Sequence, residues 1–342
     1  YWPSRNGVAC WNNFNLQDWE EDFEGMHRRG YNTVRIFMIW PDFQPEEDQI
    51  NHDHIRKLKL AIDCARDKSL WVIPTFFQGW MSGTNFDPKW RDGRNHIQDP
   101  SLRAAMIRLI QATCHQIADC SNLLAVDLAN EINVICPDVT PSSLRAWTGE
   151  LRSAIQTIIK DVLVTNGTAD VPIQAESSWT HEDQDIDFIC MHGYPMFWTP
   201  VPFTSLKSAR SSQVFGATVA IAAADSRPVM RQEYGVAMGG DGPLVEGFVK
   251  TSSFASYLAG AHGFLYWCWR DFATSEAPYQ DVPFESSMGY MDTSLKAKSW
   301  SKGYDYFKNF LLSHIGWQPI FDSVEILIPK RLKKLNKNAD YG

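Results

Sequence analysis

Short apolar segments alternate with longer amphipathic segments along most of the 342 residues of the chain. Most of the short segments are nearly continuous apolar runs, as expected of parallel strands that are buried on both faces. These runs predict eight strands: Gly7–Cys10, Thr33–Ile39, Leu70–Phe77, Leu123–Ala129, Val171–Ala175, Asp187–Met191, Pro228–Gln232 and Gly263–Cys268.

The longer segments carry apolar residues at three- and four-residue spacing, which is typical of helices that bury one face. The predicted helices are Leu16–Arg29, His54–Lys68, Leu102–Asp119, Pro141–Asp161, Ser205–Ala224 and Leu244–Leu258. Eight strand–helix repeats predict an α/β fold of the (β/α)8 TIM-barrel type. A doubly wound sheet gives the same local signals, but no glycine-rich phosphate loop follows an early strand, so the barrel is favoured.

The end of the chain differs from the repeats. A last helix is predicted at Phe307–Ile315, which gives a catalytic barrel domain of residues 1–315. Residues 316–342 form a C-terminal extension with an apolar run and a basic end. This extension either begins a further small element or is a solvated tail.

Composition excludes several classes of function. The net charge of −8 disfavours a nucleic-acid partner, and no apolar stretch reaches the 18 residues that a membrane span needs. The seven cysteines include no CxxC pair and no cluster with zinc-ligand spacing, so we expect neither a metal nor a cofactor. Unpaired thiols favour a cytoplasmic protein, although a removed signal peptide would leave the same sequence. Nothing indicates an oligomeric state.

Two glutamates lie where predicted strands end. Asn130-Glu131 follows the fourth strand, and Glu233 follows the seventh. In a (β/α)8 barrel, the carboxyl ends of the strands carry the active site. Glycoside hydrolysis needs two facing carboxyl groups, one to protonate the leaving oxygen and one to attack the anomeric carbon or activate water. The pair therefore indicates a glycosidase, and a surface or salt-bridged role is the alternative for either residue.

Other strand ends also suit a sugar site. Arg35 lies within the second strand and needs an acidic partner, which is either Glu233 or a structural carboxylate elsewhere. Glu176 ends the fifth predicted strand and could bind a sugar hydroxyl or cap a loop. The remaining candidates are polar or aromatic rings that could contact a sugar: His192, Tyr194, Trp267 and Trp269.

These residues resemble glycoside hydrolase clan A, and most closely family 5, over residues 1–300. The resemblance implies a retaining double displacement with Glu131 as acid/base and Glu233 as nucleophile. Asn130 would then bind the sugar 2-hydroxyl, and Arg35 and Tyr194 would bond to the nucleophile. Glu131 would be held protonated while Glu233 is ionised.

Within family 5 the chain is similar to the bacterial β-mannosidase-type subgroup. The shared stretches are Tyr1–Pro3, Trp40–Pro45, Pro74–Gly83, Asn85–Trp90, Trp267–Phe272 and Pro283–Glu285. The resemblance implies an exo-β-mannosidase that binds a small β-mannoside in a pocket, with Trp80 and Trp90 among the substrate-binding residues. The subgroup usually has His where Trp80 stands. An endo-β-mannanase or β-glucanase on the same scaffold, and a non-catalytic sugar-binding barrel, remain open alternatives.

Overall fold

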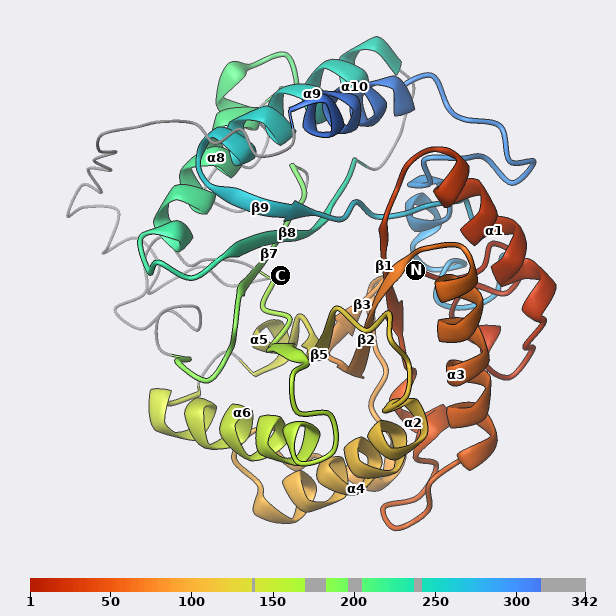
Figure 1. Ribbon diagram of the computed structural model, residues 1–342, viewed down its shortest axis with the longest axis vertical. Coiled ribbons are helices and arrows are strands. Elements are labelled where there is room, and N and C mark those ends of the chain that lie inside the picture. Colours follow the sequence, from red (N-terminus) through yellow and green to blue (C-terminus); the bar gives the residue numbers. More distant parts are fainter. Residues whose placement is uncertain (137–138, 170–182, 196–204, 237–241, 315–342) are drawn as a thin grey trace.

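The computed structural model describes residues 1–136, 139–169, 183–195, 205–236 and 242–314. Parallel strands occupy the centre and helices surround them (Figure 1). The strands of this central layer are β1 (Thr33–Phe37), β2 (Trp71–Gln78), β5 (Ala125–Asn130), β6 (Leu163–Thr165), β7 (Ile189–Gly193), β8 (Val229–Tyr234) and β9 (Ala261–Phe264).

The central strands form two parallel sheets, with the orders β1-β2-β5-β6 and β7-β8-β9. The backbone N–H of Asp187 donates to the carbonyl of Val164 at 2.8 Å, which joins β6 to the residues preceding β7. The register places Thr75 of β2 beside Asp127 of β5, and His192 of β7 beside Glu233 of β8. The strands therefore bring polar side chains together at their carboxyl ends.

The helices begin at polar capping residues and bury one face on the sheets. Asp99 accepts a hydrogen bond from the N–H of Leu102 at the start of α4, and Thr140 accepts one from Ser143 at the start of α6. The helices are α1 (Leu16–Arg28), α2 (Trp40–Phe43), α3 (His52–Asp67), α4 (Pro100–Ile117), α5 (Ile132–Ile135), α6 (Pro141–Gln156), α8 (Ala209–Ala223), α9 (Gly242–Leu258) and α10 (Ser301–Ser313).

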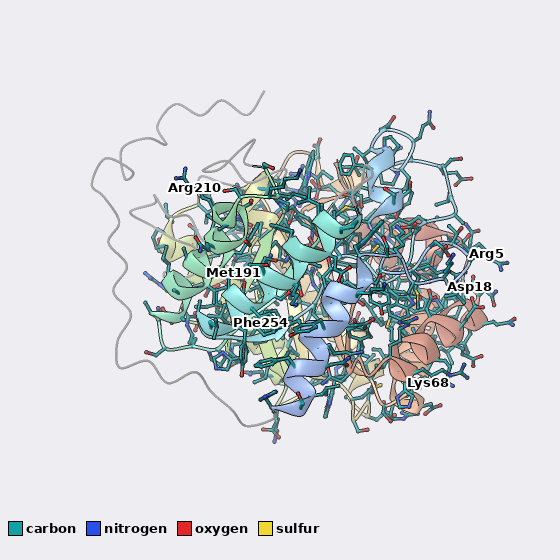
Figure 2. The ribbon with its side chains drawn as sticks, turned by 90° about the horizontal axis from the view of Figure 1, so that it is seen from above. Arg5, Asp18, Lys68, Met191, Arg210 and Phe254 are labelled. Carbon is teal, nitrogen blue, oxygen red and sulfur yellow. The ribbon has the colours of Figure 1, made fainter. Side chains whose placement is uncertain are left out.

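Figure 2 shows α9 and α10 side by side on one flank of the barrel. Phe254 of α9 packs edge to face on Phe307 and Phe310 of α10, with ring centroids 5.1 and 4.9 Å apart. Contact between these rings, of which Phe307 is buried, stabilises the packing of α10 on α9. Helix α10 begins six residues before the predicted start at Phe307.

Two of the strand predictions need correction and one strand was missed. The strand predicted at Gly263–Cys268 is β9, which spans Ala261–Phe264. Gly7–Cys10 is a 3-10 helix (η1), because Gly7 adopts a φ of +50° that no strand permits. β6 was not predicted: it has three residues, too few to show a strand pattern, and the helix predicted to run to Asp161 ends at Gln156. The predicted strand Val171–Ala175 and the extension 316–342 lie outside the described residues.

The loop after β2 forms a small hairpin of β3 (Trp80–Met81) and β4 (Thr84–Asn85), followed by the 3-10 helix η2 (Lys89–Arg91). The long segment after β9 contains another 3-10 helix, η3 (Pro283–Ser287). All seven cysteines are buried and unpaired. In the part of the chain that the structure describes, every helix is too short or too polar to cross a membrane.

Candidate active site

Glu131 immediately follows β5 in a left-handed backbone conformation, with a φ of +51°. Its N–H donates to the carbonyl of Gly167 at 2.9 Å. Gly167 itself has a φ of +64°, and a Cβ there would overlap the carbonyl oxygen of Ala129. Only glycine lets the loop after β6 approach the end of β5 so closely, and that loop fixes the unusual backbone of Glu131.

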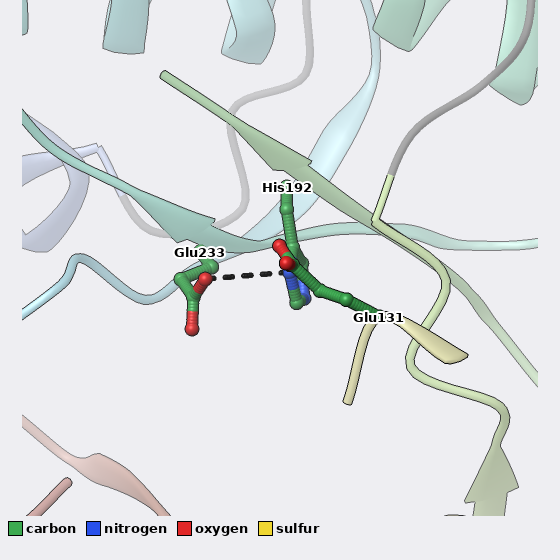
Figure 3. A group of neighbouring side chains, drawn as sticks. All are labelled: Glu131, His192 and Glu233. Atoms are coloured by element: carbon green, nitrogen blue, oxygen red, sulfur yellow. Dashed lines mark hydrogen bonds and ion pairs between the residues drawn. The ribbon is translucent and has the colours of Figure 1, made fainter. Parts of the chain in front are cut away.

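Glu233 lies on β8 and is 6% exposed. Its Oε2 is 3.4 Å from Nδ1 of His192, and that same Nδ1 is 2.8 Å from Oε1 of Glu131 (Figure 3). One ligand-type atom from each of the three residues lies within 4.8 Å of the others. Retaining glycosidases hold their carboxyl groups roughly 5–5.5 Å apart, whereas inverting ones need roughly 6.5–9.5 Å. With one oxygen of each carboxyl group within 4.8 Å of the other, the pair is too close for the inverting spacing and fits the retaining one.

The surroundings of Glu131 and His192 set their charge states. Burial raises the pKa of Glu131, the hydrogen bond from His192 opposes that rise, and the charge of Glu233 adds to it. Burial alone would lower the pKa of His192, but Glu233 and Glu131 together raise it. A carboxyl that stays protonated toward neutral pH is what a general acid requires.

A chain of buried polar side chains supports the two glutamates. Arg35 contacts Glu233 at 3.4 Å, but its shorter ion pair, 2.6 Å, is with Asp127 in the middle of β5. Gln232 donates to Asp127 at 3.1 Å and bonds His192 through its amide oxygen at 3.0 Å. Arg35 therefore pairs both with Glu233 and with a structural carboxylate, as the two predicted alternatives had it. The ion pair with the structural carboxylate, Asp127, is the shorter of the two.

We expect Asp127→Asn to destabilise the fold strongly, because it leaves the buried charge of Arg35 with only the more distant Glu233. Removing one partner of a buried ion pair costs about 3–5 kcal/mol in the free energy of unfolding. Urea unfolding at neutral pH measures this loss in the free energy of unfolding. Asp53→Asn, which breaks an exposed pair with Lys57, is the control and should change the midpoint little. Equal midpoints for both variants would contradict the prediction.

The contact between His192 and Glu131 gives a pH prediction. Because the His192 hydrogen bond holds down the pKa of Glu131, His192→Phe should raise that pKa further. The acid form of Glu131 would then persist to higher pH, so the basic limb of kcat/KM should move upward while the maximum falls. His27→Phe, at an exposed position of α1, should leave the profile unchanged. A basic limb that moves downward would contradict this assignment.

Asn130, Tyr194 and Trp267 lie around the glutamates. Oδ1 of Asn130 accepts from Arg35 at 2.8 Å, and its Nδ2 donates to the carbonyl of Trp80 at 2.6 Å. Burial and the charge of Glu233 raise the pKa of Tyr194 well above its ordinary value. Trp267 is buried and, with Arg35 and Glu233, lines a cavity of about 70 Å³ between β1 and β9. These three join the site.

The remaining predicted site residues differ in where they lie. Trp269 is buried: its ring stacks on Tyr290 at 5.3 Å and packs against Gly25 of α1, and it lines the same cavity as Trp267 and Glu233. Trp90 packs edge to face on Trp40, and its Nε1 donates to the carbonyl of Gln44. Trp80 is 40% exposed on the hairpin beside Asn130. Glu176 lies outside the described residues.

Three residues of the site were not predicted. Asp127 is a lone acid within an apolar strand, which signals a buried cationic partner. Gln232 precedes Glu233, and a polar residue there could have been noticed as an end-of-strand group. Glu285, which accepts a hydrogen bond from Nε1 of Trp267 at 2.9 Å, ends one of the stretches shared with the β-mannosidase-type subgroup, but its local pattern did not mark it as a site residue.

Glu131, His192 and Glu233 also have the spacing to hold a metal ion. The guanidinium of Arg35, 3.4 Å from Glu233, disfavours a cation there because it places a positive charge against the same carboxylate. The donor set fits acid–base and nucleophilic chemistry better than metal binding.

A barrel with two glutamates at the retaining spacing defines a retaining glycoside hydrolase. The model of the family described as Cellulase (glycosyl hydrolase family 5) matches residues 3–273. The chain therefore belongs to glycoside hydrolase family 5, and both the resemblance and the (β/α)8 barrel predicted from the sequence are confirmed. No sequence among the curated proteins matches the chain significantly.

Several solved structures share this fold. Exo-β-1,4-mannosidase Op5Man5 from Opitutaceae bacterium strain TAV5 has a TM-score of 0.84 and 28% identity over 92% of this chain, which spans 58% of that one. GH5_18 from Streptomyces cattleya in complex with GlcNAc has a TM-score of 0.83 and 21% identity, covering 93% and 80%. The endo-β-1,4-mannanase from Thermotoga petrophila has a TM-score of 0.68 and 14% identity, covering 86% and 74%.

Proposed function

We propose that the protein is a retaining exo-β-mannosidase that acts on small β-mannosides without a cofactor. The observation that carries the glycosidase chemistry is the pair Glu131 and Glu233 at the retaining spacing, with His192 between them. The similarity to exo-β-1,4-mannosidase Op5Man5 supports the substrate. The seven unpaired thiols support a reducing compartment such as the cytoplasm.

The reaction takes two displacements at the anomeric carbon. Glu233, held beside Arg35, attacks that carbon while protonated Glu131 donates its proton to the departing glycosidic oxygen. The resulting ester of Glu233 is then attacked by water, from which ionised Glu131 removes a proton. The sugar leaves with its original anomeric configuration, and Glu131 regains its proton for the next cycle.

The loops around the barrel mouth support exo action. Gly83 in the β3–β4 hairpin has a φ of +75° and lies so close to Val282 that a Cβ would be 2.6 Å from its Cγ1. The loop after β2 thus touches the segment after β9. Contact between these two loops is what a pocket for a terminal sugar requires, and it supports exo action.

Two measurements test the proposal. Among 4-nitrophenyl β-mannoside, β-glucoside and β-galactoside, the mannoside should be hydrolysed fastest; a faster glucoside would overturn the choice of sugar. From mannotetraose, the first products should be mannose and mannotriose. Initial release of mannobiose would instead indicate an endo-acting mannanase. Tight sugar binding without turnover of any glycoside would indicate a non-catalytic sugar-binding barrel.

A further inference from the structure

Glu285 is a third carboxyl group at the mouth of the barrel, and the two displacements described above leave it unused. It lies in η3, in the long segment after β9, and is 8% exposed. Its Oε2 accepts a hydrogen bond from Nε1 of Trp267 at 2.9 Å. An ionised carboxylate offers about four acceptor positions, and the indole N–H occupies one of them.

Glu285 is linked to the catalytic pair through Trp267, which bonds Glu285 and lines one cavity with Arg35 and Glu233. Burial raises its pKa to about 7; the hydrogen bond from Trp267 opposes this rise, and the charges of Glu233 and Glu131 add to it. Glu285 in turn contributes to the raised pKa of Tyr194. These charges act together with the hydrogen bond to Trp267, which places the Glu285 carboxyl beside a ring of the site.

The position of Glu285 depends on the contact between the two loops. The β3–β4 hairpin, which holds Gly83 and the buried Ser82, packs on Val282 immediately before η3 and its Glu285. Burying a carboxyl costs free energy unless polar groups compensate. If the contact between the hairpin and the segment after β9 were only structural, apolar side chains would fill it at lower cost. A carboxyl kept at this place therefore indicates a polar partner that arrives with the substrate.

We propose that Glu285 determines specificity by hydrogen bonding to a hydroxyl of the reacting sugar, while its bond to Trp267 fixes the ring against which that sugar rests. Because the carboxyl is buried, a sugar that lacks the hydroxyl leaves it without that partner, and the site discriminates strongly against such a sugar. The inference rests on glycosidase action at Glu131 and Glu233, but not on mannose being the sugar.

The test is a set of kinetic constants for Glu285→Gln, which has nearly the same shape, and for the control Glu276→Gln, an exposed position of the same segment. The substrates are the 4-nitrophenyl β-glycoside that the wild type hydrolyses fastest and its 2-, 3-, 4- and 6-deoxy analogues. Glu285→Gln should lower kcat/KM for the parent about 10- to 100-fold. The penalty for a deoxy analogue is the ratio of kcat/KM for the parent to kcat/KM for that analogue. At one hydroxyl position, this penalty should shrink by a similar factor in Glu285→Gln.

Several outcomes separate this role from a structural one. Glu276→Gln should keep the full set of wild-type penalties. Glu285→Asp, which withdraws the carboxyl by one methylene, is a second variant and should weaken the same penalty. A soluble Glu285 variant with unchanged penalties at every hydroxyl, or loss of folding in both variants, would overturn the proposal. A wild type that hydrolyses no aryl glycoside would overturn this proposal and the proposed function together, whereas a preference for a sugar other than mannose would overturn only the latter.

Discussion

Glu233→Ala should abolish hydrolysis, with kcat falling by about 10⁵-fold or more, as when a covalent nucleophile is removed. The side chain is buried between Arg35 and His192, so alanine leaves a small space next to the anomeric carbon. Azide fits such a space and should partly restore cleavage of an activated aryl glycoside. Because azide would attack from the side that Glu233 occupies, the product should be the glycosyl azide of inverted configuration.

The variant should fold, because Arg35 keeps its closer ion pair with Asp127. Thermal unfolding of Glu233→Ala checks this point, and Glu20→Ala, at an exposed position of α1, is the matched control for activity. Turnover by Glu233→Ala within a few-fold of the wild type would remove Glu233 from the role of nucleophile.

Most of the fold could be predicted because strands buried on both faces leave a strong apolar signal in the sequence. The exceptions have local physical causes. β6 is only three residues long, and Gly7 in η1 adopts a positive φ that an apolar pattern cannot reveal. Neither error changes the strands that carry Glu131 and Glu233. The two glutamates therefore face each other at the strand ends, as predicted.

Site residues that lie at strand ends could be predicted from the sequence. Site residues that are positioned by tertiary contacts could not. Trp267 and Trp269 are two residues apart, and a continuous strand would place both on one face. β9 ends at Phe264, however, and the two rings separate: one bonds Glu285 and the other stacks on Tyr290. Glu285 shows the same limit, because its place depends on an irregular segment that meets a hairpin about 200 residues earlier in the chain.

Glu131→Ala should produce a loss that depends on the leaving group. Without the general acid, a glycoside with a poor leaving group, such as a disaccharide, should be cleaved about 10²- to 10⁴-fold more slowly. A 2,4-dinitrophenyl glycoside needs no protonation, so its first step should be nearly spared and the ester of Glu233 should accumulate as a burst. Equal losses on both substrates would remove Glu131 from the acid role.

Azide gives the same variant a second and independent test. In Glu131→Ala the sugar is already bound to Glu233, so azide should attack from the opposite side and yield the glycosyl azide of retained configuration. Glu233→Ala should give the inverted azide from the same substrate. The basic limb of kcat/KM should also disappear in Glu131→Ala, because the raised pKa of Glu131 is the ionisation that this limb reports. Azides of the same configuration from both variants would contradict the assignment of separate roles to the two glutamates.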